Sequence, residues 1–236
     1  MNILIDIVHP AHVHLLRNSY HEMAGKGHKV VVTCKHIPSA MQLLEMYEIP
    51  YIYLGEKKDN ILLKAFEQLW YNVKLLRIAR HEKCTIAVGS SITLAHIAAL
   101  SRWAIFRPRI NAILLDDDDD EVEPLYAKYG HPFADVVLSP KETPRTTKKV
   151  IYYPAYHELA YLHPNRFVPD PSVLDDAGIH YERDASGNVE NVEPYFVMRF
   201  NAFKAHHDVG VVGLTIENKR RMVQLLSQHG KVFITT

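Results

Sequence analysis

Three histidines gather at the end of the first apolar run of the chain. His9, His12 and His14 follow residues 2–8, which read as a β-strand, and lie at the start of a helical segment that ends near residue 26. Neutral imidazole can bind a metal ion or accept a proton near pH 7. The cluster could therefore be a metal site or hold a catalytic base, or it could only hydrogen-bond to the loop backbone.

The helical spacing favours the catalytic role. At about 100° per residue, His12 and His14 lie roughly 200° apart around a helix, so they are poorly placed to share one ion. His12 falls in the first turn, where the positive end of the helix keeps its imidazole neutral and able to accept a proton. We predict catalytic roles for His12 first and His14 second, substrate binding for His9, and no bound metal.

A glycine and two serines follow a later apolar run, residues 84–89. Gly89 permits a tight turn after a strand, and Ser90 or Ser91 can cap the next helix. The N–H groups at such a helix start can bind an anion or a sugar hydroxyl. We predict that Gly89, Ser90 and Ser91 bind substrate, although helix capping alone would also explain the serines.

Five consecutive aspartates, Asp116–Asp120, follow the strand-like segment 110–115. Carboxylates can bind a divalent ion, and they can also complement the positive end of a following helix. A third role is to accept hydrogen bonds from the hydroxyl groups of a substrate. We assign this third role to Asp116 and Asp117.

A basic loop follows the strand-like segment 193–200. Cationic side chains and the N–H groups of a following helix converge there, as in sites that hold a diphosphate. Asp208 could orient a neighbouring histidine, and a solvated polar loop is the structural alternative. The predicted diphosphate-binding residues are Arg199, Lys204, His206, His207 and Asp208.

These candidates need a framework that brings strand ends together. Over the first 155 residues, Val- and Ile-rich runs alternate with segments of helical periodicity. This alternation predicts an α/β fold, a Rossmann-like doubly wound parallel sheet with right-handed crossovers. Ligands of such sheets bind beyond the carboxyl ends of the strands. The six predicted strands are residues 2–8, 29–34, 51–54, 84–89, 110–115 and 134–139.

The pattern changes near residue 156, and we predict a first domain over 1–155. Residues 156–172 contain three prolines and read as a linker. Residues 173–236 read as the beginning of a second Rossmann-like domain, with one helix between two strands. One helix and two strands rarely bury a stable core by themselves. We therefore expect that the natural protein continues beyond Thr236 and that this chain alone is inactive.

The composition limits the kinds of partner and the cellular location that we expect. The 27 basic and 27 acidic residues balance, which gives no overall attraction to nucleic acid. Cys34 and Cys84 lie in apolar runs and read as buried, reduced thiols, typical of a cytoplasmic protein. No run reaches the ~18 apolar residues of a spanning helix. The apolar, cationic helix 60–81 and the segment 101–109 could lie against anionic lipid at the inner membrane face, or the helix could simply pack on the sheet.

Several segments together resemble a known family. They are DIVHPAHVHLL, GKGHKV, AVGSS, FADVVLSP, YHELAYLHP and MRFNAFKAHHD. The match is collinear over nearly the whole chain and resembles the bacterial and archaeal domain-of-unknown-function family 354. That family is similar to the glycosyltransferase-B (GT-B) superfamily, which includes the UDP-GlcNAc 2-epimerases. The resemblance implies two facing Rossmann-like domains with a cleft between them.

The resemblance also implies a function. AHVHLL lies where the lipid-linked GlcNAc transferase has a catalytic histidine loop, which places His12 at that histidine, although the glycines of the loop are absent here. Arg199 falls where relatives contact the donor diphosphate. We therefore expect a metal-independent, cofactor-free glycosyltransferase of surface polysaccharide or glycolipid synthesis, with a nucleotide sugar and a glycan or lipid-linked acceptor as partners. A nucleotide-sugar 2-epimerase, a non-catalytic glycan-precursor-binding module and a metal-dependent hydrolase are the alternatives.

Overall fold

A computed structural model describes residues 1–56, 61–103, 105, 107–200 and 213–235. The chain divides into two compact units, Met1–Phe167 and Val168–Thr236. Each unit is described by itself below. In the part of the chain that the structure describes, no helix is both long and apolar enough to cross a membrane.

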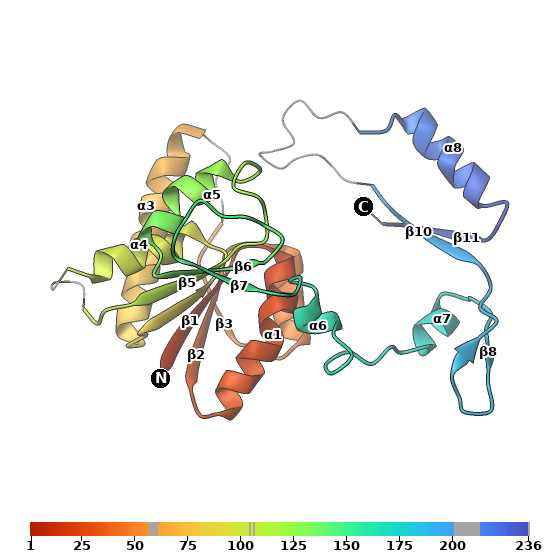
Figure 1. The fold of residues 1–236 in the computed structure, drawn as a ribbon, viewed down its shortest axis with the longest axis horizontal. Helices are drawn as coiled ribbons and strands as arrows, with labels where there is room; N and C mark the ends of the chain where they lie inside the picture. Colours follow the sequence, from red (N-terminus) through yellow and green to blue (C-terminus); the bar gives the residue numbers. More distant parts are fainter. Residues whose placement is uncertain (57–60, 104, 106, 201–212, 236) are drawn as a thin grey trace. The chain divides into compact units, whose positions relative to one another are not determined.

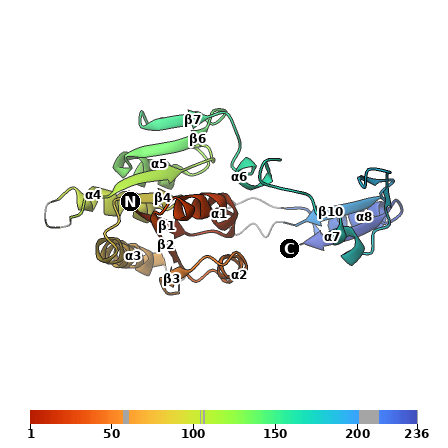
Figure 2. The same cartoon turned by 90° about the horizontal axis from the view of Figure 1, so that it is seen from below.

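Unit 1 is built on one parallel sheet of seven strands. The strand order is β3-β2-β1-β4-β5-β6-β7, which Figure 2 shows in one row. The order reverses direction between β1 and β4, which is the topological switch point of a doubly wound sheet. The strands are Asn2–Ile7 (β1), Lys29–Cys34 (β2), Tyr51–Tyr53 (β3), Ile86–Gly89 (β4), Asn111–Leu115 (β5), Val136–Pro140 (β6) and Val150–Tyr153 (β7).

Helices cover both faces of this sheet (Figure 1). Alternation along β1 sends Ile5 and Ile7 into the core beneath α1 and α2, whereas Leu4 packs in the core beneath α3, α4 and α5. The helices of unit 1 are Pro10–Gly25 (α1), Pro38–Met46 (α2), Ile61–His81 (α3), Ile92–Ser101 (α4), Pro124–Tyr129 (α5) and Leu159–Leu162 (α6), with a 3-10 turn at His131–Phe133 (η2). The predicted α/β class and parallel sheet are confirmed.

Two features of unit 1 differ from the sequence prediction. Strand β7, the apolar run 150–153, was not predicted, because residues 141–149 join it to β6 without the helix that the alternating pattern leads one to expect. The helix expected directly after the fifth strand begins only at Pro124, since residues 116–123 form turns. The predicted burial of Cys34 and Cys84 is confirmed, and burial raises the pKa of each thiol to about 11.

The predicted linker 156–172 contains the boundary between the units, but its first part packs on unit 1. Asn18 of α1 donates a hydrogen bond to the carbonyl oxygen of Ala160 in α6 at 2.8 Å. The rings of His14 and Tyr161 lie 5.4 Å apart. Residues up to Phe167 therefore belong to unit 1, which extends the first domain beyond the predicted limit at residue 155.

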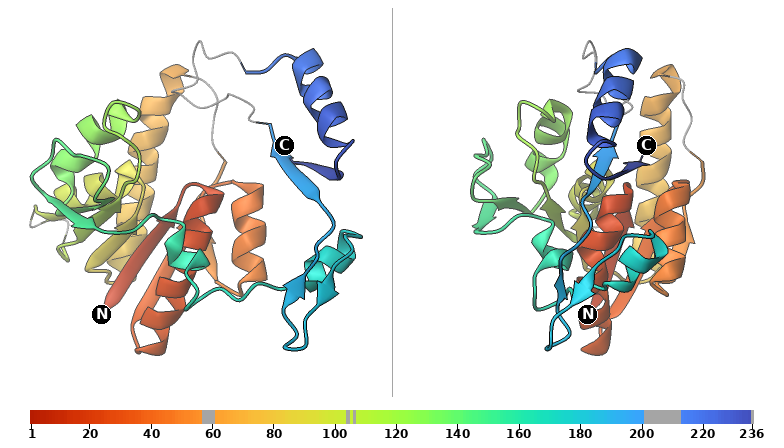
Figure 3. Two further views of the ribbon diagram at one scale, coloured as in Figure 1. Left: turned by 45° about the vertical axis from the view of Figure 1, so that its right-hand side comes forward. Right: turned by 90° about the vertical axis from the view of Figure 1, so that its right-hand side faces the viewer.

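Unit 2 contains a small β-α-β segment (Figure 3). Strands β10 and β11 are parallel, and the side chain of Thr215 caps α8 by accepting from the N–H of Asn218. A turn at residues 184–188 joins β8 to β9 in a hairpin. The elements are Ser172–Asp176 (α7), Glu182–Arg183 (β8), Val189–Glu190 (β9), Tyr195–Arg199 (β10), Ile216–Leu226 (α8) and Lys231–Thr235 (β11). Among the described residues of unit 2, only Ile179 and Met198 are buried apolar side chains.

Candidate functional site

The carboxyl edge of the sheet is tightly packed at the switch point. Gly89 ends β4 with a φ of +149°, and a Cβ there would lie 2.9 Å from the backbone oxygen of Asp6. Only glycine accepts both the backbone angle and this contact. Gly89 thus lets the β4–α4 turn lie directly against the end of β1.

Asp6 is a fully buried acid beside this turn. Its Oδ1 accepts a hydrogen bond from Thr33 Oγ1 at 2.8 Å, while Oδ2 is buried without a partner among the described residues. Burial raises the pKa of Asp6, against the opposing effects of Lys35, Thr33 and Ser91. Ser91 is itself buried and precedes α4 without a side-chain capping bond, so helix capping does not explain it. Ser90 is half-buried in the same turn.

His9 and His12 lie at the start of α1. His9 caps the helix, because its Nδ1 accepts a hydrogen bond from the N–H of Ala11 at 3.2 Å. His12 is half-buried, and its Nδ1 is buried without a partner in the described part of the chain. The two rings are 5.8 Å apart. His12 therefore presents an imidazole that no hydrogen bond from Nδ1 holds in place.

His12 is neutral at pH 7. Burial is the main cause that lowers its pKa to about 4; His9 and His157 lower it further, and Asp117 opposes them. The neutral state agrees with the sequence prediction, but its cause is burial rather than the helix end.

Asp117 and His157 contact each other at the same edge. His157 Nδ1 lies 3.1 Å from Asp117 Oδ2, and only 12% of the His157 side chain is exposed. Its ring stacks on Tyr153 with centroids 6.1 Å apart. His157 Nε2 and the Tyr153 hydroxyl are buried without partners among the described residues. The hydrogen bond from His157 lowers the pKa of Asp117, so the carboxylate stays charged at neutral pH.

Together His12, Asp117 and His157 define the candidate site. They follow β1, β5 and β7 at the carboxyl edge, and both Asp117 and His157 influence the pKa of His12. The site thus combines a neutral imidazole with a carboxylate whose charge favours protonation of that imidazole.

A buried ionic network lies next to this site. Arg145, whose side chain is fully buried, places Nη1 2.9 Å from Asp116 and 3.0 Å from Asp120. Its Nε donates to Ser139 Oγ at 2.8 Å. His131 Nε2 lies 2.7 Å from Asp116 Oδ2, the same oxygen that Arg145 contacts. Asp116 therefore binds its own chain, whereas the neighbouring Asp117 faces the candidate site.

This network has the residue types of a cation site but does not fit one. Ligand atoms of Asp116, Asp120 and His131 lie within 4.8 Å of one another. The guanidinium of Arg145 already contacts both carboxylates, and its charge would repel a divalent ion. We assign the carboxylates to Arg145 rather than to a metal.

The remaining predicted residues lie elsewhere. His14 is on another side of α1, where its Nδ1 lies 3.0 Å from the Tyr47 hydroxyl. Arg199 is an exposed residue at the end of β10 in unit 2. Lys204, His206, His207 and Asp208 lie outside the described residues. The structure therefore brings His9, His12 and Asp117 to one edge with Gly89, Ser90 and Ser91, but not His14.

The sequence prediction missed Asp6, Arg145, Tyr153 and His157. Asp6 could have been noticed as an acid inside an otherwise apolar strand. His157 lies in the YHELAYLHP segment that carries the family resemblance, but no strand was expected before it. Without β7, nothing in the pattern places residue 157 at the sheet edge.

Comparison with solved structures defines the fold class. The chain is similar to S. aureus MnaA solved with UDP, with a TM-score of 0.57, 11% identity and coverage of 100% of this chain and 62% of that chain. It is also similar to the UDP-GlcNAc 2-epimerase of Neisseria meningitidis bound to UDP-GlcNAc, with a TM-score of 0.59 and 12% identity. The match covers 100% of this chain and 72% of the epimerase chain. Anabaena HepE, solved with UDP and glucose, is similar with a TM-score of 0.57 and 13% identity. The match covers 99% of this chain and 68% of the HepE chain.

The chain therefore has the fold of the GT-B glycosyltransferases and UDP-GlcNAc 2-epimerases. At these identities the similarity shows the fold alone, and the chain spans less than two thirds of the MnaA length. No family model matches the chain, and no curated protein matches it. Membership of domain-of-unknown-function family 354 stays a prediction.

Proposed function

We propose that the protein is a metal-independent GT-B enzyme that transfers a sugar from a nucleotide diphosphate to an acceptor hydroxyl. The observation that carries the proposal is the neutral His12 beside the Asp117–His157 pair, at the sheet edge where ligands of this fold class bind. The similar structures contain UDP, UDP-GlcNAc, or UDP and glucose, which supports a nucleotide sugar as donor.

In the proposed reaction, His12 accepts the proton of the acceptor hydroxyl. The acceptor oxygen forms a bond to the anomeric carbon as the bond from that carbon to the diphosphate oxygen breaks. The leaving diphosphate takes the electron pair of the broken bond. The Asp117 carboxylate stabilises the imidazolium that forms on His12, because it is the charge that raises the His12 pKa.

A nucleotide-sugar 2-epimerase is the second candidate. One of the three structures compared above, from N. meningitidis, is named a UDP-GlcNAc 2-epimerase. An epimerase needs two proton-handling groups at one sugar ring, and His12 and His157 could serve. Solvent deuterium would then enter the sugar, whereas a transferase would leave its carbon-bound hydrogens unexchanged.

The proposal is tested by ligand binding and by sugar transfer. A series of UDP-, GDP- and CMP-sugars is screened by thermal unfolding, because a ligand of the native state raises the melting temperature by mass action. We expect one nucleotide sugar to stabilise the protein, and His12→Gln to retain that binding but lose sugar transfer. Stabilisation by none of them would refute the proposal. Tight binding without transfer or exchange would indicate a glycan-precursor-binding module.

A further inference from the structure

Helix α3 has one face in the core and another in solvent. Tyr71, Leu75 and Ala79 are buried in the core beneath the helix, so α3 packs on the sheet. The exposed residues that the structure describes on α3 are Phe66, Leu69, Trp70, Arg77, Arg80 and His81. At about 100° per residue, the first five of them lie within an arc of about 100° on the side opposite Leu75. This outer face of α3 is apolar in its first half and basic in its second.

The segment that follows α4 extends the outer face of α3. Arg80 Nε donates to the carbonyl oxygen of Arg107 at 3.2 Å, which holds this segment beside the end of α3. Helices α3 and α4 cover the same side of the sheet (Figure 2). The exposed residues described between 102 and 109 are Arg102, Trp103, Ile105, Arg107 and Arg109. We call these five residues and the outer face of α3 (Phe66, Leu69, Trp70, Arg77, Arg80) the aromatic–basic face.

Both tryptophans of the chain lie on the aromatic–basic face. Trp70 is 58% and Trp103 69% exposed, and nearby Phe66 and Ile105 are 73% and 72% exposed. Tryptophan is highly buried on average in folded proteins, because large apolar rings lose stabilisation when they stay in water. Exposed rings and aliphatic side chains concentrated on one surface indicate that an apolar partner covers it.

The charges of this face favour an anionic partner. Arg102 and Arg109 both contact Asp135, at 3.3 and 3.7 Å. The other three arginines form no ion pair with a carboxylate that the structure describes, namely Arg77, Arg80 and Arg107. Five guanidinium groups therefore stand against one described carboxylate, and the face attracts negative charge.

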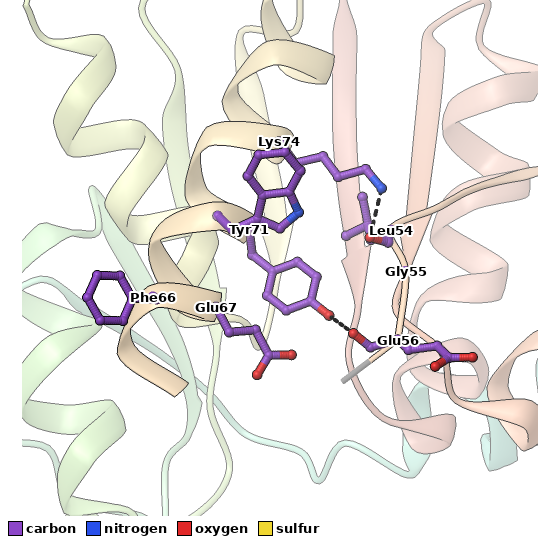
Figure 4. Close-up of a pocket in the computed structure, with 8 residues that line it drawn as sticks. Leu54, Gly55, Glu56, Phe66, Glu67, Tyr71 and Lys74 are labelled. Carbon is purple, nitrogen blue, oxygen red and sulfur yellow. Dashed lines mark hydrogen bonds between the residues drawn. The ribbon is translucent and has the colours of Figure 1, made fainter. Parts of the chain in front are cut away.

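The pocket beside Trp70 does not change this balance. It has a volume of about 470 Å³ and lies on the β3 side of α3, toward which Lys74 points, whereas Phe66 points away (Figure 4). A second ammonium group, that of Lys35, lies 4.0 Å from the centre of the Tyr71 ring in the pocket wall. These two cations match the two acidic residues of the lining, Glu56 and Glu67.

An anionic lipid surface fits both properties of the face. Negatively charged headgroups attract arginines near the membrane surface. Tryptophan rings favour the level between the headgroups and the acyl chains. The exposed aliphatic and phenyl side chains would enter the acyl boundary. A nucleic acid would attract the arginines equally, but its phosphate backbone offers no apolar layer to cover Leu69 and Ile105.

We propose that the aromatic–basic face docks the protein on an anionic lipid surface, with α3 lying along that surface and both tryptophan rings among the headgroups. From Phe66 to Arg80 the helix spans about 21 Å, so the contact is made along its length rather than at one point. The inference goes beyond the proposed sugar transfer and does not rest on it, because none of these residues belongs to the candidate site.

Vesicle flotation tests the proposal with the whole chain and without any nucleotide sugar. Vesicles of phosphatidylcholine alone are compared with vesicles that contain phosphatidylcholine and phosphatidylglycerol in equal parts. We expect the anionic vesicles to bind at least tenfold more tightly, because several arginines act together. Added salt should reduce this preference, since it screens charges at an exposed surface.

Tryptophan fluorescence locates the contact. Trp103→Phe leaves Trp70 as the single reporter, and Trp70→Phe leaves Trp103. Lipids brominated on their acyl chains quench a ring that enters the bilayer. Anionic brominated vesicles should therefore quench both single-tryptophan proteins, and unbrominated vesicles should quench neither. Binding that leaves both rings unquenched would place the contact elsewhere and reject this face.

Two pairs of variants connect binding to the face. Arg77→Gln combined with Arg107→Gln should weaken binding to anionic vesicles about tenfold or more. Arg220→Gln with Arg221→Gln, which removes two exposed arginines of α8, makes the same change of charge and should have little effect. The melting temperature of each variant reports whether it folds.

The second pair removes an exposed aliphatic side chain. Ile105→Ser should weaken binding at least threefold, because its side chain no longer enters the acyl boundary. Val168→Ser is the control, since Val168 is 84% exposed and lies outside the face. It should bind as the wild type does.

Each outcome decides the inference. No binding to anionic vesicles, equal binding to neutral ones or equal effects of the control variants would overturn it. Binding of a DNA duplex instead of vesicles would do the same, as would self-association through this face without vesicle binding. Vesicle binding without stabilisation by any nucleotide sugar would reject the proposed function and keep the lipid surface. The reverse result would reject the lipid surface and keep the function.

Discussion

His157 Nδ1 lies 3.1 Å from Asp117 Oδ2, and this pair joins the segment after β7 to the end of β5 beside His12. The pair is the part of the site that the sequence did not reveal. It gives Asp117 a fixed partner and leaves His157 Nε2 buried without a described partner. Four predictions follow from this site and its surroundings.

Asp117→Asn should lower the pKa of His12 below its value of about 4. The negative charge of Asp117 favours imidazolium at His12, and the amide removes that charge. Histidine ring-proton signals followed by NMR between pH 3 and 8 measure the change directly. Asp119→Asn, in the same acidic run, is the control and should leave His12 unchanged. An unshifted His12 in Asp117→Asn would mean that the two groups do not interact.

His12 should make unit 1 less stable in mild acid. The folded pKa of about 4 lies below the ordinary 6.5, so the unfolded chain binds the extra proton as the pH falls from 6.5 to 4. Stability from the neutral ring is complete above pH 6.5 and is lost through this window. Between pH 7 and 5 the loss is up to about 2 kcal/mol, and His12→Gln should remove it.

Urea unfolding at both pH values measures this effect. Trp70 and Trp103 both belong to unit 1, so their fluorescence reports its unfolding. His21→Gln, an exposed histidine on the same helix, should keep the wild-type pH dependence. Identical pH dependence in His12→Gln and wild type would contradict the burial of His12.

Arg145→Met should destabilise unit 1 by about 3–5 kcal/mol, because it leaves the buried carboxylates of Asp116 and Asp120 without their cation. Arg109→Met removes an exposed arginine 3.7 Å from Asp135 and should cost less than about 1 kcal/mol. Urea unfolding compares the two variants. If divalent ions restored the stability of Arg145→Met, the three-ligand cluster could accept a metal once the guanidinium is removed.

Gly89→Ala should cost about 2 kcal/mol or more. The new Cβ would meet the backbone oxygen of Asp6 at 2.9 Å and Leu94 Cδ1 at 3.2 Å, in a backbone conformation that strains alanine. Gly25→Ala is the matched control, since nothing lies within 4 Å of its added Cβ at the end of α1 and helix propensity favours alanine. Thermal unfolding should give a lower melting temperature for the first variant and an unchanged or higher one for the second.

The repeating pattern of strands and helices was enough to predict the α/β class and six strands of unit 1, because buried parallel strands are continuous apolar runs. The same pattern missed β7, a short apolar run at the edge of the sheet that no helix separates from β6. Spacing correctly separated His12 from His14 around α1. It could not show that Asp116 pairs with Arg145 while Asp117 pairs with His157. These two partners lie far along the chain, one after β6 and the other after β7, and the spacing within the acidic run says nothing about them.

Part of the candidate site depends on β7, an edge strand of the sheet. Edge strands open more readily than central ones, because hydrogen bonds to one neighbour alone protect them from exchange with solvent. Fraying of β7 would carry Tyr153 and His157 away from Asp117 while the centre of the sheet stays intact. The protein could in this way lose its proton-handling pair through a local opening that costs far less than global unfolding.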